Sequence, residues 1–557
     1  MALSKKLLIA ILLIAAILRF QGIFWGIPIF DPLVQGYHPD EPKIIKAAYK
    51  FPYHIITNKD LRYPTFYAYS LGTLTIPVKL AFIIKEWSFS VPSLYVFMTV
   101  FGRYMSIVLG LGSIFLTFVL GKRLYGETVG LLSALFLSLS LYHVQNSAWA
   151  TLDVPDCFFI LLTLYFAFKM YEQPTRRSYL ITGVSLGILV GTKYDGAIVL
   201  LSILVLHYYR TLKNEEEKLP AFIKSSLSKD LRLLLLWSLA IFLLTTPDII
   251  LKPWVFIDAL YAQHNLYIGR EYESIFGFSI FPQIVKNFII AADPILGILM
   301  ILGLVYPFRK RWDKEIPLLA VVVPFLLYHG ALQSRHLIAV LPLTSILAAQ
   351  AVFSIYKKRR FLSLKPVWVS LLGLWIIFAI SYNEAGMLLR MNDTRTTAAH
   401  WIEKNFPQGA TIGATSIGNY RRGDSRFPRI DTGKYKIVDA LEKPKFIILT
   451  SYDYIEMEEV LSPSKLQNEK WYRKFAAHWH PTHSPSNLHN YKWDPKYTAE
   501  WHRADPPSEE VFRFYDDILN EKGNKYNYRL IKKFEKNIFV PIEFPSPGIR
   551  IYERVED

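Results

Sequence analysis

The sequence predicts a polytopic α-helical membrane protein that carries a C-terminal extracytoplasmic domain of the α/β or α+β class. Of its 557 residues, 52% are hydrophobic and 15% aromatic, which is more than a soluble domain of this size usually contains. The apolar residues fall in blocks of about 20, the length that a helix needs to cross about 30 Å of hydrocarbon. The last third of the chain instead shows the patterns of one amphipathic helix and several strands.

Eleven apolar segments are candidate spans, and the distribution of basic residues orients them. With these spans, the Lys and Arg clusters of the first 360 residues all fall on the same side as the N-terminus, as cytoplasmic loops require. The sequence therefore predicts an integral plasma-membrane protein with a cytoplasmic N-terminus and an extracytoplasmic C-terminal domain. The expected spans cover residues 6–26, 93–120, 127–145, 154–172, 178–192, 196–210, 231–249, 287–306, 316–332, 336–356 and 367–385.

The charge pattern also decides the course of two segments that the apolar pattern alone leaves open. Residues 178–210 must form two short helices broken near "GTKYDG", because a single long helix would reverse every later loop. Residues 65–86 are apolar but carry Pro77, Lys79 and Lys85, so we expect them to make no net crossing. They should lie at the outer surface, or dip into it, within a first external loop of about residues 29–92.

The chain should divide into a transmembrane domain, 1–385, and a soluble domain, 386–557. In the soluble domain "RTTAAHWIEKNF" predicts a helix, and "ATIGATS", "KFIILTSY", "YRLIKKF" and "GIRIYERV" predict strands. Residues 466–510 are typical of a loop.

Composition excludes several classes of function. The chain has 63 Lys and Arg against 46 Asp and Glu, a net charge of +17, but basic cytoplasmic loops explain this excess without a nucleic-acid partner. The single cysteine, Cys157, lies in an apolar run, so an intrachain disulfide is excluded and redox chemistry is not expected.

Acidic and basic side chains from at least five separate loops meet at the predicted outer face. A proton-coupled transporter would place such charges near the midplane, on broken helices. Arg19 and Arg103 lie within spans, where a charge usually faces a partner or a cavity. The loop residues are His38, Asp40 and Glu41; Asp153 and Asp156; Lys193 and Asp195; Asp248; and Arg335 and His336.

Structural explanations stay open for some of these residues. Asp40 could cap a helix over 41–51 with Pro42 in its first turn, and Asp153 could cap the span that follows it. Arg335 could simply anchor a helix at the headgroup level.

Metal binding is a further alternative. Asp153 and Asp156 could hold a divalent ion through oxygen ligands. The stretch "HWHPTH" places His478, His480 and His483 at a spacing that could bind zinc, although a solvated loop or an acceptor contact is the better explanation.

An ordered set of motifs resembles the GT-C glycosyltransferases of the protein O-mannosyltransferase and aminoarabinose (lipid A) transferase type. The set spans most of residues 1–356, and "FPSPGIRIYER" near the C-terminus is also similar to members of this group. In order, the motifs are "HPDEP", "RYPTFYAY", "GRYMSIVLGLGSIFLTFVLGKRLYGE", "HVQNSAWATLDVPDCFF", "GILVGTKYDG" and "SRHLIAVLPL".

The resemblance implies a GT-C-like membrane domain, a polyprenyl- or dolichyl-phosphate sugar as donor, and roles for particular residues. Asp40 matches the catalytic carboxylate, with Glu41 beside it in the same motif. Lys193 and Arg335 match basic positions near the lipid phosphate, and Arg62 matches a basic residue ahead of a proline. Relatives often have two prolines where this chain has "YPT", so the register around Arg62 is open by a residue or so.

These roles fit the chemistry of sugar transfer. A hydroxyl acceptor needs a carboxylate to take its proton, for which Asp40 is the candidate, and the leaving phosphate needs Lys or Arg. We assign Lys193, Arg335, Arg62 and Arg103 to the phosphate, and place His38, Asp153, Asp156 and His336 beside the substrate or a metal.

The expected enzyme is an inverting glycosyltransferase that moves a hexose such as mannose to a protein or glycan hydroxyl. Transfer of an aminosugar or another sugar to a lipid acceptor is the alternative, and a transporter or flippase of the lipid-linked sugar comes third.

Overall fold

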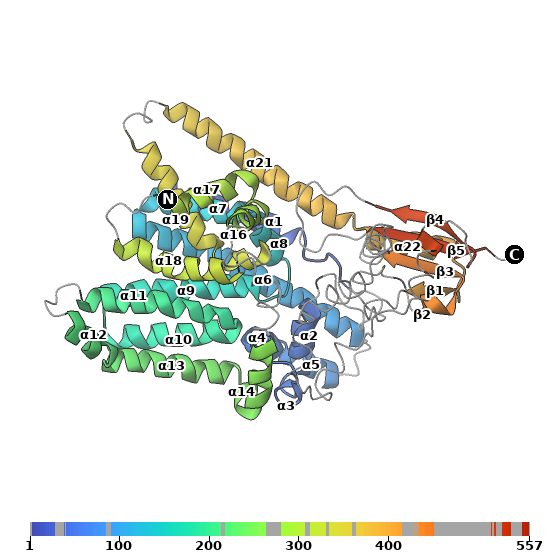
Figure 1. Cartoon of the computed structure of the whole chain (residues 1–557), viewed down its shortest axis with the longest axis horizontal. Coiled ribbons are helices and arrows are strands. Elements are labelled where there is room, and N and C mark those ends of the chain that lie inside the picture. Colours follow the sequence, from blue (N-terminus) through green and yellow to red (C-terminus); the bar gives the residue numbers. More distant parts are fainter. Residues whose placement is uncertain are drawn as a thin grey trace, which may run out of the picture.

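A helical bundle and a mixed β-sheet make up the chain, with the sheet beyond one end of the bundle (Figure 1). The computed structural model describes residues 3–27, 38, 40–84, 91–212, 218–262, 280–306, 312–329, 334–358, 364–414, 428, 430, 433–450, 514, 517–519, 526–535 and 548–555. The segment 466–510 and His478, His480 and His483 lie outside these residues.

Helices occupy all eleven segments in which spans were expected. These helices are α1 (Leu3–Phe20), α6 (Val91–Tyr125), α7 (Glu127–Leu139), α8 (Leu141–Ser147), α9 (Asp153–Glu172), α10 (Arg176–Thr192), α11 (Val199–Leu212), α13 (Lys229–Thr245), α16 (Ile280–Ala291), α17 (Pro294–Val305), α18 (Trp312–His329), α19 (Leu341–Tyr356) and α21 (Lys365–Met391). Shorter elements connect them: α2 (Glu41–Lys50), α3 (His54–Thr57), α4 (Phe66–Leu74), α5 (Ile76–Ile84), η1 (Tyr194–Ile198), α12 (Lys218–Ser226), α14 (Asp248–Leu251) and η2 (Ser334–Ala339).

The described helices support a membrane protein. Four of them are long and apolar enough to cross a bilayer, and the bent pair α7–α8 can be counted as a fifth. The count of eleven crossings and the orientation of the termini stay predictions. The expected domain boundary after residue 385 falls inside α21, which continues to Met391.

The predicted break near "GTKYDG" is present. Helix α10 ends at Thr192, the short helix η1 follows, and α11 begins at Val199. The described part of residues 65–86, which ends at Ile84, contains the two nine-residue helices α4 and α5, each too short to cross by itself.

Glycines bring α10 and α13 into close contact. A side chain at Gly183 would come within 2.4 Å of the Leu234 carbonyl, and one at Gly187 within 2.5 Å of the Ser238 carbonyl. Small residues four apart let two helix backbones approach in a membrane, where dispersion contacts and not water exclusion hold helices together.

Backbone groups at the helix breaks in the bundle have hydrogen-bond partners in neighbouring helices or caps. Helices α7 and α8 meet at Ser140 with a 64° bend, and the amide of Leu141 donates to the carbonyl of Ala292 at 2.8 Å. The carboxylate of Asp293 caps α17 and also accepts from the Trp375 indole of α21 at 3.3 Å. Backbone groups freed by the breaks therefore keep partners inside the apolar core, as a membrane interior requires.

The C-terminal region holds a five-stranded sheet in the order β2-β1-β3-β5-β4. Strands β1 (Thr411–Ala414), β2 (Lys436–Asp439) and β3 (Phe446–Thr450) are parallel, whereas β5 (Ile549–Arg554) is antiparallel to β3 and to β4 (Tyr528–Phe534). Helix α22 (Thr394–Asn405) packs on this sheet through an apolar cluster. The predicted helix and four strands are confirmed, and β2 was not expected.

The segment between α2 and α5 lies at the end of the bundle nearer the sheet (Figure 1). The buried carboxylate of Asp248 holds it there, because it accepts hydrogen bonds from Tyr69 at 2.7 Å and Asn58 at 3.2 Å. This contact fixes the segment on which most of the candidate site stands.

Candidate active site

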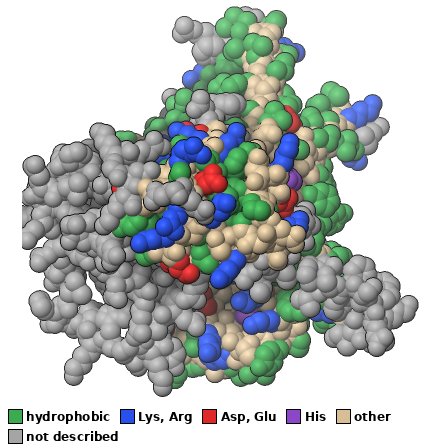
Figure 2. All heavy atoms as spheres, turned by 90° about the vertical axis from the view of Figure 1, so that its right-hand side faces the viewer, with side chains coloured by type: hydrophobic (Ala, Val, Ile, Leu, Met, Phe, Trp, Pro, Cys, Tyr) green, Lys and Arg blue, Asp and Glu red, His purple; other side chains and the backbone are tan. Residues whose placement is uncertain are grey.

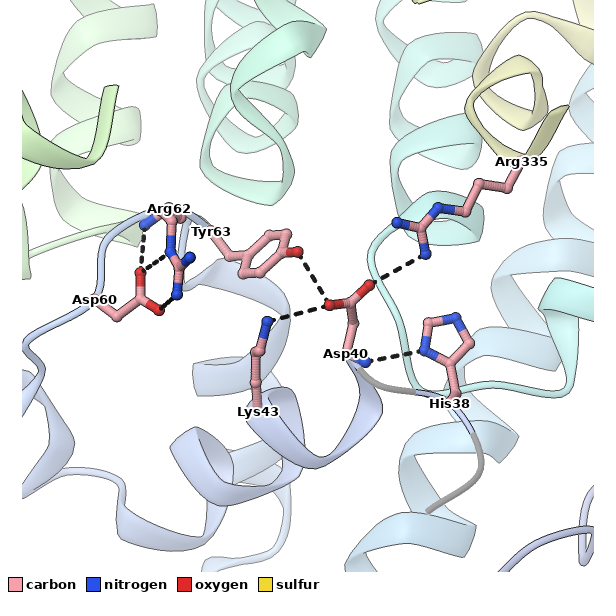
Figure 3. Close-up of polar contacts among 7 residues, drawn as sticks. All are labelled: His38, Asp40, Lys43, Asp60, Arg62, Tyr63 and Arg335. Carbon is pink, nitrogen blue, oxygen red and sulfur yellow. Dashed lines mark hydrogen bonds and ion pairs between the residues drawn. The ribbon is translucent and has the colours of Figure 1, made fainter. Parts of the chain in front are cut away.

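Asp40 stands immediately before α2 and is the centre of the site. Its carboxylate accepts from the Tyr63 hydroxyl at 3.1 Å and from Lys43 Nζ at 3.3 Å, and it pairs with Arg335 Nη1 at 3.3 Å (Figure 3). The Asp40 and Arg335 side chains are each 20% exposed. One carboxylate is thus surrounded by two cations and a phenol, and solvent can reach it.

The capping explanation for Asp40 is half right. Asp40 occupies the N-cap position of α2 and Pro42 lies in the first turn, but the carboxylate makes no capping hydrogen bond. Its oxygens face Tyr63, Lys43 and Arg335 instead, so the side chain is available for chemistry. Arg335 likewise pairs with Asp40, which replaces the expectation of a headgroup anchor.

The surroundings of Asp40 favour its charged form. Burial by itself would raise the pKa of this carboxyl. The electrostatic effects of His38, Arg335 and Lys43, with the hydrogen bond from Tyr63, outweigh burial and hold the pKa well below its usual range. Asp40 is therefore a carboxylate at neutral pH.

Tyr63 and Lys43 are site residues that the sequence interpretation missed. Lys43 lies one helical turn after Asp40, a spacing that brings two side chains together and could have identified it. Tyr63 is adjacent to Arg62 in the motif "RYPTFYAY", but only the folded loop turns its hydroxyl toward Asp40 (Figure 3).

We expect Tyr63→Phe to move the acid limb of the activity profile to higher pH. Loss of the hydroxyl removes a donor to the Asp40 carboxylate, so the pKa of Asp40 should rise toward its ordinary value. The measurement is the pH dependence of kcat/KM for sugar transfer. Tyr53→Phe, an exposed tyrosine of the same loop, is the control and should leave the profile unchanged.

Glu41 and Arg103 form a buried ion pair. This corrects the expectation that Glu41 is catalytic and that Arg103 binds the donor phosphate. Both side chains are buried, and the Glu41 carboxylate takes two bonds from the Arg103 guanidinium, at 2.7 and 2.6 Å. Arg103 also donates to the carbonyls of Ile23 and Trp25, and Glu41 accepts the Ala150 amide at 2.9 Å. These contacts leave neither residue placed to act as a base or to bind a donor phosphate.

Arg62 also has a partner in its own loop. Its Nε donates to Asp60 Oδ1 at 2.8 Å and its Nη2 to Oδ2 at 2.5 Å (Figure 3). Because a two-point bond from one carboxylate already occupies the guanidinium, Arg62 fits a phosphate-binding role less well than Arg335.

A second charged group lies where α9, α10 and α18 approach. Lys193 Nζ lies 3.0 Å from Asp153 and 3.4 Å from Asp195, and Asp195 pairs with His329 at 3.0 Å. Two carboxylates already balance Lys193, so its assignment to the donor phosphate would require it to leave them. Leu152, not Asp153, occupies the cap position of α9, so the capping explanation for Asp153 is wrong.

Of the remaining candidates, Asp156 and His336 lie beside this group and His38 lies beside Asp40. Asp156 is fully buried in the first turn of α9, and the His336 ring stacks on His329 with centroids 5.1 Å apart. The Asp40 amide donates to His38 Nδ1 at 3.1 Å. Among the described residues, no group of three or more His, Cys, Asp or Glu side chains could hold a metal ion.

The end of the molecule that carries the C-terminal sheet has charge of both signs on its described surface. Lys and Arg side chains are grouped there with a few Asp and Glu among apolar residues (Figure 2).

Comparison with known proteins adds a family match. Residues 93–226 match the family model described as dolichyl-phosphate-mannose-protein mannosyltransferase. A protein of Aquifex aeolicus (strain VF5) described as uncharacterized is 31% identical over 107 residues, which are 19% of this chain and 21% of that relative's length.

Two solved structures are similar to this chain. The archaeal oligosaccharyltransferase AglB from Archaeoglobus fulgidus, in complex with an inhibitory peptide and a dolichol-phosphate, superposes with a TM-score of 0.51 at 12% identity, over 99% of this chain and 88% of AglB. ArnT from Cupriavidus metallidurans bound to undecaprenyl phosphate gives a TM-score of 0.46 at 12% identity, over 83% of this chain and 96% of ArnT. Residues 93–226 thus match a mannosyltransferase family, and the chain as a whole shares the fold of AglB.

Proposed function

We propose that this protein transfers a sugar from a polyprenyl- or dolichyl-phosphate donor to an acceptor hydroxyl at the outer face of the membrane. The observation that carries the proposal is the position of Asp40, a solvent-accessible carboxylate with Arg335 and Lys43 on it. A base and phosphate-binding cations are the two groups that this reaction needs within a few ångströms of each other.

The chemistry is a single displacement. The acceptor oxygen attacks the anomeric carbon while the bond from that carbon to the phosphate oxygen breaks, so the configuration inverts. Asp40 takes the proton of the acceptor hydroxyl, and the lipid phosphate leaves with its negative charge stabilised by Arg335 and Lys43.

Donor binding would also strengthen the base. While Asp40 pairs with two cations, its low pKa makes it a weak proton acceptor. A phosphate that draws Arg335 and Lys43 toward itself removes these pairs, and the pKa of Asp40 then rises. The carboxylate thus becomes a better base once the donor is in place.

We expect Arg335→Gln to raise the donor KM roughly tenfold to a hundredfold. The variant removes a charged donor whose hydrogen bonds to a phosphate contribute about 1.5–3 kcal/mol. The measurement is the transfer rate as a function of donor concentration in lipid nanodiscs.

Arg62→Gln is the matched control for this variant. Because Asp60 already holds Arg62, its loss should change the donor KM less than about threefold. An equal effect of both substitutions would contradict the assignment of the phosphate to Arg335.

The function is tested with purified protein, polyprenyl-phosphate mannose, and peptide, glycan and glycolipid acceptors in separate reactions. Labelled sugar on a peptide or glycan supports the principal proposal. Label on the glycolipid, or transfer only from an aminosugar donor, supports the alternative acceptor class. A donor that crosses the bilayer intact, with no acceptor labelled, would instead identify a lipid-linked sugar transporter.

A further inference from the structure

Three arginines and two tryptophans form a continuous stack between the sheet-bearing region and the site. Each guanidinium carbon lies within 5.9 Å of an indole centroid, and the two indoles meet edge to face at 4.9 Å. We call this group the arginine–tryptophan stack; in order its members are Arg395, Trp25, Arg390, Trp149 and Arg103.

Arg390 connects the two halves of the stack. Its guanidinium carbon lies 5.2 Å from the Trp25 ring and 5.4 Å from the Trp149 ring. It also donates to the side chain of Gln145 in α8 at 2.9 Å. A planar guanidinium against aromatic faces, away from water, is a strongly directional contact.

Carboxylates fix both ends. Asp393 caps α22 and holds Arg395 through two bonds, at 2.8 and 2.6 Å. At the other end Glu41 holds Arg103. Because the side chains of all three arginines are buried, the stack has little freedom to rearrange without breaking contacts.

Through Trp149 and the residue after it, the stack contacts the residues on either side of Asp40. The Trp149 ring lies 5.0 Å from the His38 ring, and His38 in turn accepts the amide of Asp40. The next residue, Ala150, donates its amide to Glu41. Asp40 is therefore held from both sides by one short segment of chain.

The other end reaches the sheet. Arg395 lies in the first turn of α22, and Ala398 and Ile402 of the same helix are buried against residues of β1, β3 and β5. The position of the sheet is thus connected to the position of Asp40 through buried, closely packed side chains.

We infer that the arginine–tryptophan stack is a positioning device, through which the C-terminal region holds Asp40 in its working place; this rests on the proposed role of Asp40 as the base. Arg390 and Trp149 are positioning residues, since both side chains are buried.

The test replaces Arg390 with Met in the full chain and compares it with Arg123→Met. Arg123 is a matched control because its guanidinium also lies on an aromatic ring, that of Tyr165 at 5.3 Å, and pairs with a carboxylate. It stands 20 residues after Arg103 in the same helix, about 30 Å away along the axis.

Two readouts separate positioning from bulk stability. We expect Arg390→Met to speed hydrogen exchange of the amides in residues 40–50 about tenfold and to lower kcat about tenfold, with the donor KM changed less than about threefold. Arg390→Lys, which keeps the charge but not the planar group, should recover part of both. Arg123→Met should leave exchange in this segment and kcat unchanged.

The inference would be overturned if Arg390→Met lowers the melting temperature as much as Arg123→Met does but leaves both kcat and the exchange of residues 40–50 unchanged. If Arg390→Met does not fold, Trp149→Phe, which removes the larger ring beside His38, is read by the same two measurements and the same criteria. The exchange experiment needs no substrate, so it decides the inference even if no donor is consumed and the proposed function fails.

Discussion

Asp40→Asn should lower the rate of sugar transfer about 100-fold to 10,000-fold, the range that loss of a general base produces. The amide has the same shape and still accepts from Tyr63, but it takes no proton from the acceptor hydroxyl. The variant also leaves Arg335 and Lys43 without the carboxylate charge between them. Donor binding should therefore weaken less than turnover.

Asp60→Asn is the control for this experiment. Asp60 lies in the same loop and is also paired with an arginine, but it does not contact Asp40. Its transfer rate should stay within about threefold of wild type. Turnover of Asp40→Asn within tenfold of wild type, with normal folding, would rule out Asp40 as the base.

The difference in stability between wild type and Asp40→Asn should also depend on pH. The lowered pKa means that the Asp40 carboxylate contributes to the free energy of unfolding above the unfolded-state pKa of about 3.9. That contribution is lost as the pH falls through the folded-state pKa. The difference in melting temperature between wild type and Asp40→Asn should therefore be full at neutral pH and shrink in strong acid.

Glu41→Leu should destabilise the fold by about 3–5 kcal/mol, because it leaves the Arg103 charge buried without its carboxylate. Arg103→Leu should cost a similar amount, because it leaves the Glu41 carboxylate buried without the guanidinium. The measurement is thermal unfolding in detergent, followed by tryptophan fluorescence.

The double variant distinguishes an ion pair from two independent contributions. When both charges are replaced by leucine, no uncompensated charge remains, and most of the loss should be recovered. Recovery should be incomplete, since the carbonyls of Ile23 and Trp25 and the amide of Ala150 lose their partners. Losses that simply add would contradict the pairing.

Local pattern was enough to predict most of the elements. Blocks of apolar residues and breaker motifs predicted eleven helical segments, and helices occupy all of them. Alternating residues predicted four of the five described strands. Strand β2 was missed because it has only four residues, Lys436–Asp439, too few for an alternation to be recognised. The ordered motifs also indicated a resemblance to mannosyltransferases, and residues 93–226 match a family model of that description.

The sequence by itself therefore determined a helical membrane protein with a sheet-containing C-terminal region and the loops that contribute the charges, since periodicity and the order of segments are properties of the chain. Which charges pair was decided by the tertiary structure alone. Asp40 and Glu41 are neighbours with the same chemistry, yet one carboxylate meets Arg335 at an accessible edge and the other is buried on Arg103. Arg335 lies 295 residues from Asp40. A charge becomes a base or a structural tie according to its distance to other charges and its access to water, and only packing sets these two quantities.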